Sequence, residues 1–314
     1  IVDTYSHANA RINLTMLFWE NGMNATVTNL DIKPEIKPRH MSMPFEQIDT
    51  PYFFAGNALL STFFAALSST FPAGEGEFIA SVRLYRDKVK DPLLQEQIRG
   101  FIGQEGHHSR QHQRANEVLR DLGLDAVALD KHLESYIARR VHKHSPKFRL
   151  ATTVGMEHLT AILAEHILTY PEIVETLSEP VKDLLYWHAV EEIEHKAVAF
   201  DTFMSIENDQ KYLRRMMVWA TLFFIHRISW YMGKLLWQQK KLPSWSDIKG
   251  FAGFMFGKKG MFTGITKNYL DFYKKGFHPW DHENRELIER WQREFYREDQ
   301  DVGAQRAAEK AKSA

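Results

Sequence analysis

The sequence predicts an all-α fold in which a four-helix bundle is extended by additional C-terminal helices. Apolar residues recur with helical spacing almost everywhere after Gly56, and this period is the main sequence sign of amphipathic helices. Prolines mark the starts or ends of several of these segments. A pattern of a glutamate and a histidine three residues apart occurs on two of the expected helices. Four-helix bundles use this pattern to direct polar side chains toward their interior.

Composition limits the function classes. The 314 residues suffice for one large domain or two small ones, and a hydrophobic fraction of 44% allows a substantial core. The 40 basic residues are balanced by 40 acidic ones, which argues against nucleic-acid binding. The absence of cysteine excludes disulfides, thiolate catalysis and cysteine-ligated clusters. Because we see no signal peptide, we expect a cytoplasmic protein, with membrane association as an alternative.

The expected elements follow one another with short connections. The predicted helices are 55–70, 73–89, 92–121, 126–140, 147–169, 172–177, 181–206 and 210–239, followed by a charged surface helix at 282–298. Before them, four prolines interrupt the chain, and Val27-Thr28 forms a short strand at best. Between the last two helices, Ser244–His278 is rich in glycine, and its helical periodicity is interrupted.

These elements suggest four regions. They are an irregular N-terminal segment at 1–54, a metal-binding helical bundle at 55–206, a C-terminal helical extension packed on the bundle at 207–298, and a flexible tail at 299–314. The case for metal binding in the second region comes from the side chains described next.

The first pattern is Glu105-Gly-His-His108. Residues three apart lie on one face of a helix, so Glu105 and His108 point to the same place. A stripe of apolar residues shares this face, which therefore points into the bundle. His107 is rotated by about a hundred degrees and is a poor ligand candidate. His112 lies two turns beyond Glu105 on the same face, and we interpret it as a residue that supports a ligand.

The second pattern is His188-x-x-x-Glu192-x-x-His195, with three ligand types on one face. Glu191 also lies within a turn of both histidines, so spacing alone leaves Glu191 and Glu192 open. The analogy with the first pattern favours Glu192. Glu191 then directly precedes one ligand as Gln104 precedes another, and both suit acceptors for the free ring N–H of a metal-bound histidine.

Each pattern should be joined by a glutamate from the preceding helix. In the second half Glu157 lies on an inward face of small and apolar residues, whereas Glu165 is rotated away from it. In the first half the choice lies between Glu75 and Glu77. Glu75 is preferred because its face continues with larger apolar residues.

Together these residues predict a dinuclear metal site. Burying four carboxylates and three imidazoles without a cation would cost several kcal/mol for each unpaired charge. Carboxylate and imidazole ligands without thiolate suit iron, manganese or zinc. The expected ligands are Glu75, Glu105, His108, Glu157, His188, Glu192 and His195.

The ordered set Glu, Glu-x-x-His, Glu, Glu-x-x-His resembles that of ferritin-like di-iron carboxylate proteins. The stretches Phe71-Pro-Ala-Gly-Glu75, Gln104–His108, Trp187–Lys196 and Phe277-His-Pro-Trp-Asp281 resemble the bacterial family labelled predicted metal-dependent hydrolases. The additional His188 is similar to the extra histidine of p-aminobenzoate N-oxygenase, a di-iron enzyme. These resemblances imply a ferritin-like bundle that holds two iron ions, with manganese or zinc as alternatives.

The ligand set and its apolar surroundings favour dioxygen and a small, hydrophobic organic substrate as partners. We therefore expect a non-haem di-iron oxidase or oxygenase, an oxidoreductase. The alternative is a dinuclear metal-dependent hydrolase that uses a bridging hydroxide as nucleophile. Iron storage is the least favoured function, since the chain is much longer than a minimal cage subunit.

A further apolar stretch, Met216–Ile225, is followed by Trp230, Tyr231, Lys234 and Trp237. It is too short to span a bilayer, which needs about twenty apolar residues. The favoured interpretation is a core helix packed on the bundle. The second is a lipid-facing or substrate-access helix that gives peripheral membrane contact through 216–237. The sequence does not indicate the oligomeric state.

Overall fold

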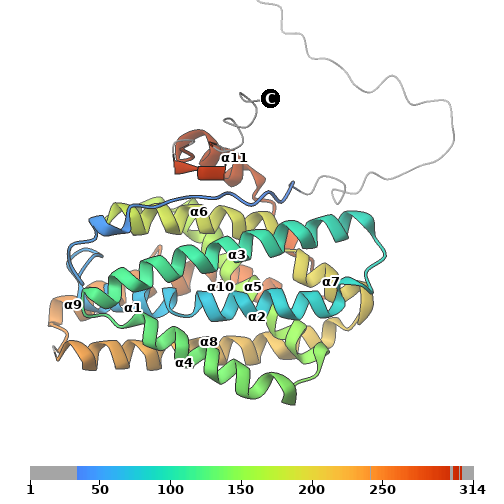
Figure 1. The fold of residues 1–314 in the computed structure, drawn as a ribbon, viewed down its shortest axis with the longest axis horizontal. Coiled ribbons are helices and arrows are strands. Elements are labelled where there is room, and N and C mark those ends of the chain that lie inside the picture. The colour runs from blue at the N-terminus through green and yellow to red at the C-terminus, as the bar shows by residue number, and fades with distance from the viewer. Residues whose placement is uncertain (1–33, 241, 298–299, 304, 306–314) are drawn as a thin grey trace, which may run out of the picture. The chain divides into compact units, whose positions relative to one another are not determined.

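The computed structural model describes residues 34–240, 242–297, 300–303 and 305, and in these residues the fold is all-α (Figure 1). The β-type backbone pairing in this part of the chain consists of two isolated bridges, Met41 with Asp301 and Phe54 with Leu177. The fold class predicted from the sequence is thus confirmed. The expected strand at Val27-Thr28 lies outside the described residues.

Side chains that cap helix ends set several boundaries. The helices are α1 Ala58–Ser68, α2 Phe71–Arg86, α3 Pro92–Asp121, α4 Ala126–Arg140, α5 Pro146–Thr169, α6 Glu179–His195, α7 Val198–Ile206, α8 Gln210–Gln239, α9 Trp245–Phe256, α10 Met261–Asp271 and α11 Arg285–Glu294. Asp91, Asp125 and Asp209 accept hydrogen bonds from backbone N–H groups in the first turns of α3, α4 and α8, and a proline follows Asp91. These caps explain why the bounds of α3, α4 and α8 agree with those expected from the sequence.

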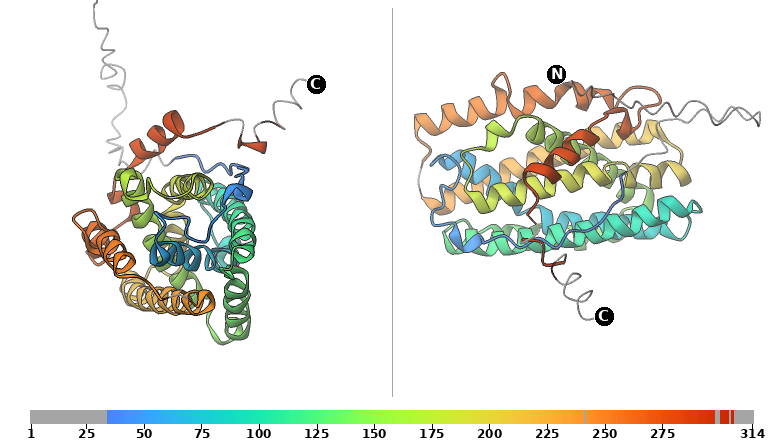
Figure 2. Two further views of the ribbon diagram at one scale, coloured as in Figure 1. Left: turned by 90° about the vertical axis from the view of Figure 1, so that its left-hand side faces the viewer. Right: turned by 90° about the horizontal axis from the view of Figure 1, so that it is seen from above.

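A bundle of α2, α3, α5 and α6 forms the centre, with α2 against α3, α5 against α6, and contacts between the two pairs. The remaining long helices cover this bundle. α4 packs on α2 and α3, α8 lies along α5 and α1, and α10 also packs on α5 (Figures 1 and 2). α5 and α8 approach closely at Gly155, where a Cβ atom would lie 2.9 Å from Cβ of Ala220. Among the described helices, none combines the length and hydropathy that a membrane span requires.

The structure corrects three expected elements. The helix expected at 181–206 is broken after His195 into α6 and α7, and the break coincides with Lys196, whose buried ammonium group donates to the carbonyl of His282. The expected helix 172–177 is a single 3-10 turn at Pro171–Val174. Ser244–His278 contains two helices, because Ser244 and Asp247 form a capping box that starts α9.

Candidate metal centre

Seven buried side chains converge inside the four-helix bundle. They come from all four of its helices: Glu75 from α2, Glu105 and His108 from α3, Glu157 from α5, and His188, Glu192 and His195 from α6. Each is at most 4% exposed. Six of them, with His112, form overlapping groups whose possible ligand atoms lie within 4.8 Å of one another. The structure thus brings together every side chain that the sequence nominated as a ligand.

Glu192 lies between the two halves of this cluster. Its Oε1 is 2.8 Å from Nε2 of His188, and its Oε2 is 3.6 Å from Nε2 of His195. Nε2 of His195 also lies 3.2 Å from Glu105 Oε1 and 3.4 Å from Glu157 Oε2. On the other side, Nε2 of His188 is 3.6 Å from Glu75 Oε1. A single carboxylate therefore links both histidines of α6.

Hydrogen bonds on the outer side fix the orientation of two imidazoles. Nε2 of His108 donates to Oε2 of Glu191 at 2.9 Å. Nδ1 of His108 is therefore unprotonated, and it has no hydrogen-bond partner. Nδ1 of His195 donates to Oε1 of Gln104 at 2.9 Å, and Nε2 of His195 is the bare atom. The Gln104 oxygen is identified because its amide nitrogen donates to Glu194 at 2.7 Å. Each histidine is thus held by a residue of the other helix, as a metal ligand requires.

His188 is oriented by a chain of hydrogen bonds. The Ser68 hydroxyl donates to Oδ1 of Asn116 at 2.7 Å, so its oxygen accepts from Nδ1 of His112 at 2.9 Å. Nε2 of His112 then accepts from Nδ1 of His188 at 2.9 Å. Both ring nitrogens of His112 are used in this chain. His112 therefore supports His188 and leaves the Nε2 of His188 facing the carboxylates.

An arginine from the N-terminal segment completes the outer layer. The Arg39 guanidinium donates to both oxygens of Glu194, at 2.5 and 2.9 Å, and to Oε1 of Glu191 at 3.0 Å. Burial alone would lower the pKa of Arg39, but these two carboxylates raise it above its ordinary value. Sequence reasoning missed Arg39 and Glu194. Arg39 lies in a proline-rich segment without periodicity, so no sequence signal pointed to it.

The interior of the cluster has many acceptors and few donors. Burial, followed by the neighbouring carboxylates, raises the pKa values of Glu105 and Glu157 well above their ordinary value. Burial also raises the pKa of Glu75, although a hydrogen bond from Ser109 opposes the shift. For Glu192, the favourable effect of His195 and His188 outweighs burial and lowers the pKa. Glu75 Oε1 and both oxygens of Glu105 and Glu157 accept no hydrogen bond. A cation suits this set.

The alternatives considered from the sequence lie outside the cluster. Glu77 is partly exposed and forms an ion pair with Arg149 at 2.6 Å. Glu165 accepts a hydrogen bond from Asn284 at 3.1 Å. The ring of His107 packs against His40, with centroids 3.8 Å apart. Glu191 is buried but faces outward, toward Arg39, Trp187 and His108.

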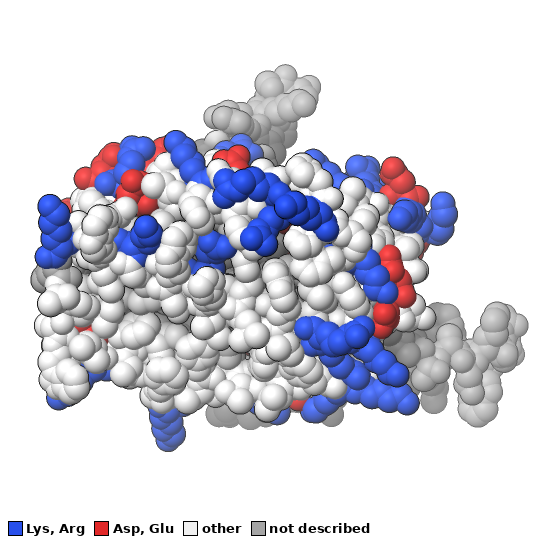
Figure 3. Space-filling view, turned by 90° about the horizontal axis from the view of Figure 1, so that it is seen from below, with Lys and Arg blue, Asp and Glu red and all other residues white. Residues whose placement is uncertain are grey.

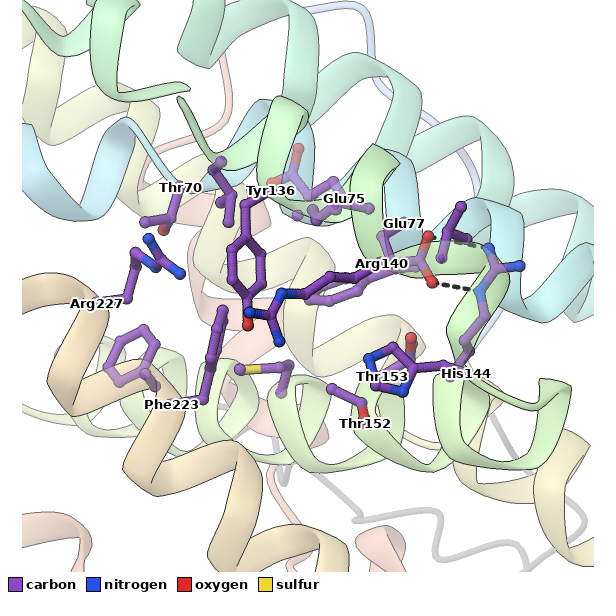
Figure 4. A pocket seen from close by; sticks show the side chains of 18 of the residues that line it. Thr70, Glu75, Glu77, Tyr136, Arg140, His144, Thr152, Thr153, Phe223 and Arg227 are labelled. Carbon is purple, nitrogen blue, oxygen red and sulfur yellow. Dashed lines mark hydrogen bonds and ion pairs between the residues drawn. The ribbon is translucent and has the colours of Figure 1, made fainter. Parts of the chain in front are cut away.

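A mainly apolar cavity of about 150 Å³ reaches the cluster from the side of α4 and α8 (Figure 4). Its wall includes Phe71, Phe78, Tyr136, Phe148, Met156, Trp219, Phe223 and Phe224. Glu75 and Thr160 also line it, and the Thr160 hydroxyl donates to Oε2 of Glu192 at 2.5 Å. Its volume exceeds that needed for a single water many times over. A small organic molecule in this cavity would therefore lie beside the carboxylates.

Comparison with known families agrees with a metal-binding role for these side chains. Residues 37–283 match the model of a family described as "Predicted metal-dependent hydrolase". The chain matches neither a curated protein nor a solved structure. The family description points to hydrolysis, so our expectation of a di-iron oxidoreductase is wrong. The error came from the ligand set, since dinuclear carboxylate sites serve both redox and hydrolytic chemistry.

We expect loss of single carboxylates to weaken metal binding. Glu105→Gln or Glu157→Gln keeps the shape of the side chain but removes its charge, and should lower the affinity for Zn²⁺ or Mn²⁺ by about tenfold or more. Calorimetric titration of the metal-free protein measures this affinity. Glu77→Gln and His107→Ala are matched controls and should bind metal as the wild type does. Unchanged affinity in the Glu105 and Glu157 variants would contradict the assignment.

We also expect Glu105→Gln to change how the stability of the metal-free protein depends on pH. The raised pKa of Glu105 means that its contribution to stability is lost as pH rises through that pKa. Glutamine cannot ionise, so the unfolding free energy of the variant should increase relative to wild type as pH rises from the ordinary pKa of a glutamate toward the raised pKa of Glu105. The relative gain should reach at most about 1.4 kcal/mol per pH unit. Urea unfolding with a chelator tests this, and a pH-independent difference would refute it.

Proposed function

The chain belongs to the family of predicted metal-dependent hydrolases, and on this premise we propose that it hydrolyses a small organic substrate at a dinuclear metal centre. One observation carries the proposal. Carboxylate oxygens without hydrogen-bond donors and bare imidazole nitrogens converge in the interior of the bundle, next to an apolar cavity. Metal ions would satisfy these atoms and turn the cavity into an active site.

In this proposal the seven buried residues from Glu75 to His195 hold two metal ions, which supply Lewis acidity and an activated water when bound. The protein side chains do the positioning. Gln104 and Glu191 keep the lone pairs of His195 and His108 directed inward. Thr160 donates to Glu192 and thereby fixes one carboxylate oxygen where the cavity meets the centre. Hydrolysis requires no redox change, so zinc or manganese would serve as well as iron.

The cavity limits the substrate that we propose. Its aromatic and aliphatic wall would favour a mainly apolar molecule. Arg227 also lines it, is only 7% exposed, and lies over the rings of Tyr136 and Phe223 at 4.6 and 5.0 Å. The guanidinium of Arg227 contacts Nδ1 of His132 at 3.5 Å, its Nε has no hydrogen-bond partner, and no Asp or Glu of the described part of the chain is among its ion-pair partners. A buried cation of this kind favours a substrate that carries an anionic group.

Metal-loaded protein should hydrolyse substrates without oxygen. We expect the metal-free protein, loaded anaerobically with Zn²⁺ or Mn²⁺, to cleave at least one member of a panel of aryl esters, anilides and aryl phosphates. Chelation and Glu105→Gln should each abolish this activity, while Glu77→Gln should retain it. Released phenol, aniline or phosphate is measured. Oxygen consumption coupled to substrate turnover with Fe²⁺, without hydrolysis by any metal form, would contradict the proposal.

Arg227 should discriminate between charged and neutral substrates. Replacing it with glutamine removes the cation, so Arg227→Gln should raise KM for an aryl ester bearing a carboxylate by about tenfold or more. The uncharged methyl ester of the same compound is the matched control and should show little change. Metal content should remain that of the wild type. Equal effects on both substrates would show that Arg227 only maintains the shape of the cavity.

A further inference from the structure

The outer side of α8, α9 and α10 exposes large hydrophobic side chains. We define this α8–α10 face by its exposed apolar residues Val218, Trp219, Leu222, Ile225, Trp230, Trp237, Leu242, Trp245, Ile248, Phe256, Phe262 and Leu270. Leu242 is 90% exposed, Trp237 78% and Trp245 69%. Large apolar patches on soluble proteins usually mark a binding surface. Most of the large exposed hydrophobic side chains of the described residues belong to these helices and their connection, so the face is a distinctive feature.

The same segment carries a strong positive charge. Residues 210–275 contain thirteen Lys and Arg residues but only two acidic ones, Asp247 and Asp271, although the whole chain is neutral. Figure 3 views the molecule from below and shows a broad surface without charged side chains, bordered mainly by Lys and Arg. Lys249 on α9 and Lys267 on α10 are exposed members of this charged set. Cationic and apolar groups thus occur together on one segment.

We propose that the α8–α10 face binds the surface of an anionic lipid bilayer. The exposed tryptophans of this face, with lysines on the same segment, are typical of side chains at the lipid headgroup level. The apolar side chains would enter the outer part of the bilayer while the cations contact acidic headgroups. A second copy of this chain suits the face less well, because two such faces would bring like charges together. Since no described helix can cross a membrane, the interaction would be peripheral.

The cavity connects this surface with the candidate metal centre. Trp219 is 38% exposed on the α8–α10 face and also lines the cavity, as do Phe223 and Phe224 from the same helix. A substrate dissolved in the bilayer would therefore reach the cavity beside α8. This link rests on the proposed hydrolase function, whereas binding to the bilayer does not.

Flotation with vesicles tests the proposal. Wild-type protein should float with vesicles of phosphatidylcholine mixed with phosphatidylglycerol, bind phosphatidylcholine alone more weakly, and be released partly by salt. The double variant Trp237→Ser/Trp245→Ser should lose about tenfold or more in affinity. Lys249→Glu/Lys267→Glu should weaken binding only to the acidic vesicles. Leu93→Ser, at an exposed site on α3 that is not part of the face, is the matched control and should bind normally.

Circular dichroism and metal content verify that each variant is folded. Neither Trp237 nor Trp245 lines the cavity. Hydrolysis of a water-soluble substrate should therefore be unchanged in the tryptophan variant, so membrane binding and catalysis can fail separately. If the wild type does not float with acidic vesicles, or if the tryptophan variant floats equally well, the proposal is wrong. It is also wrong if the wild type forms a dimer that these substitutions dissociate and does not bind lipid.

Discussion

The shortage of hydrogen-bond donors inside the bundle is the constraint that the other features satisfy. Glu105 and Glu157 are almost fully buried, and none of their carboxylate oxygens has a donor. Without a cation, the repulsion between these buried carboxylates is reduced by protonation, and the raised pKa values of Glu105 and Glu157 reflect this. A bound cation would reduce the same repulsion. Hydrogen bonds on the outer side of the cluster hold His108 and His195 in place beside these carboxylates.

Those outer bonds tie the two halves of the bundle together. His108 of α3 is held by Glu191 of α6, and His195 of α6 is held by Gln104 of α3. Arg39 then joins Glu191 to Glu194, which itself receives the Gln104 amide. This network explains how residues 34–54, which have little regular structure, are attached to the bundle. Arg39 also offsets part of the negative charge of these two outer glutamates through its ion pairs with them.

The fold and the cluster could be predicted from local residue spacing. Contacts between segments that are distant in the sequence could not be predicted in this way. The Glu-x-x-His spacing alone directs Glu105 and His108 to one place, and the apolar periodicity gives the helices around them. Arg39 meets Glu191 across a large sequence separation, and the cavity combines walls from α2, α4, α5 and α8. The periodicity of the sequence does not predict contacts of this kind between distant segments. The chemical reaction was also beyond the pattern, because one ligand set supports several chemistries.

The separation of charge along the chain connects these observations. A neutral protein gains nothing for its fold by carrying thirteen Lys and Arg residues against two acidic ones within residues 210–275, since charge distribution governs association more than architecture. These cations accompany an exposed apolar surface, while Arg227 and Trp219 of the same segment line the cavity. Under our two proposals, one helix thus serves both surfaces: α8 contacts acidic headgroups outside and binds an anionic, mainly apolar substrate inside. If both the outer face and the cavity bind molecules that are anionic and mainly apolar, this would explain why positive charge is concentrated on residues 210–275.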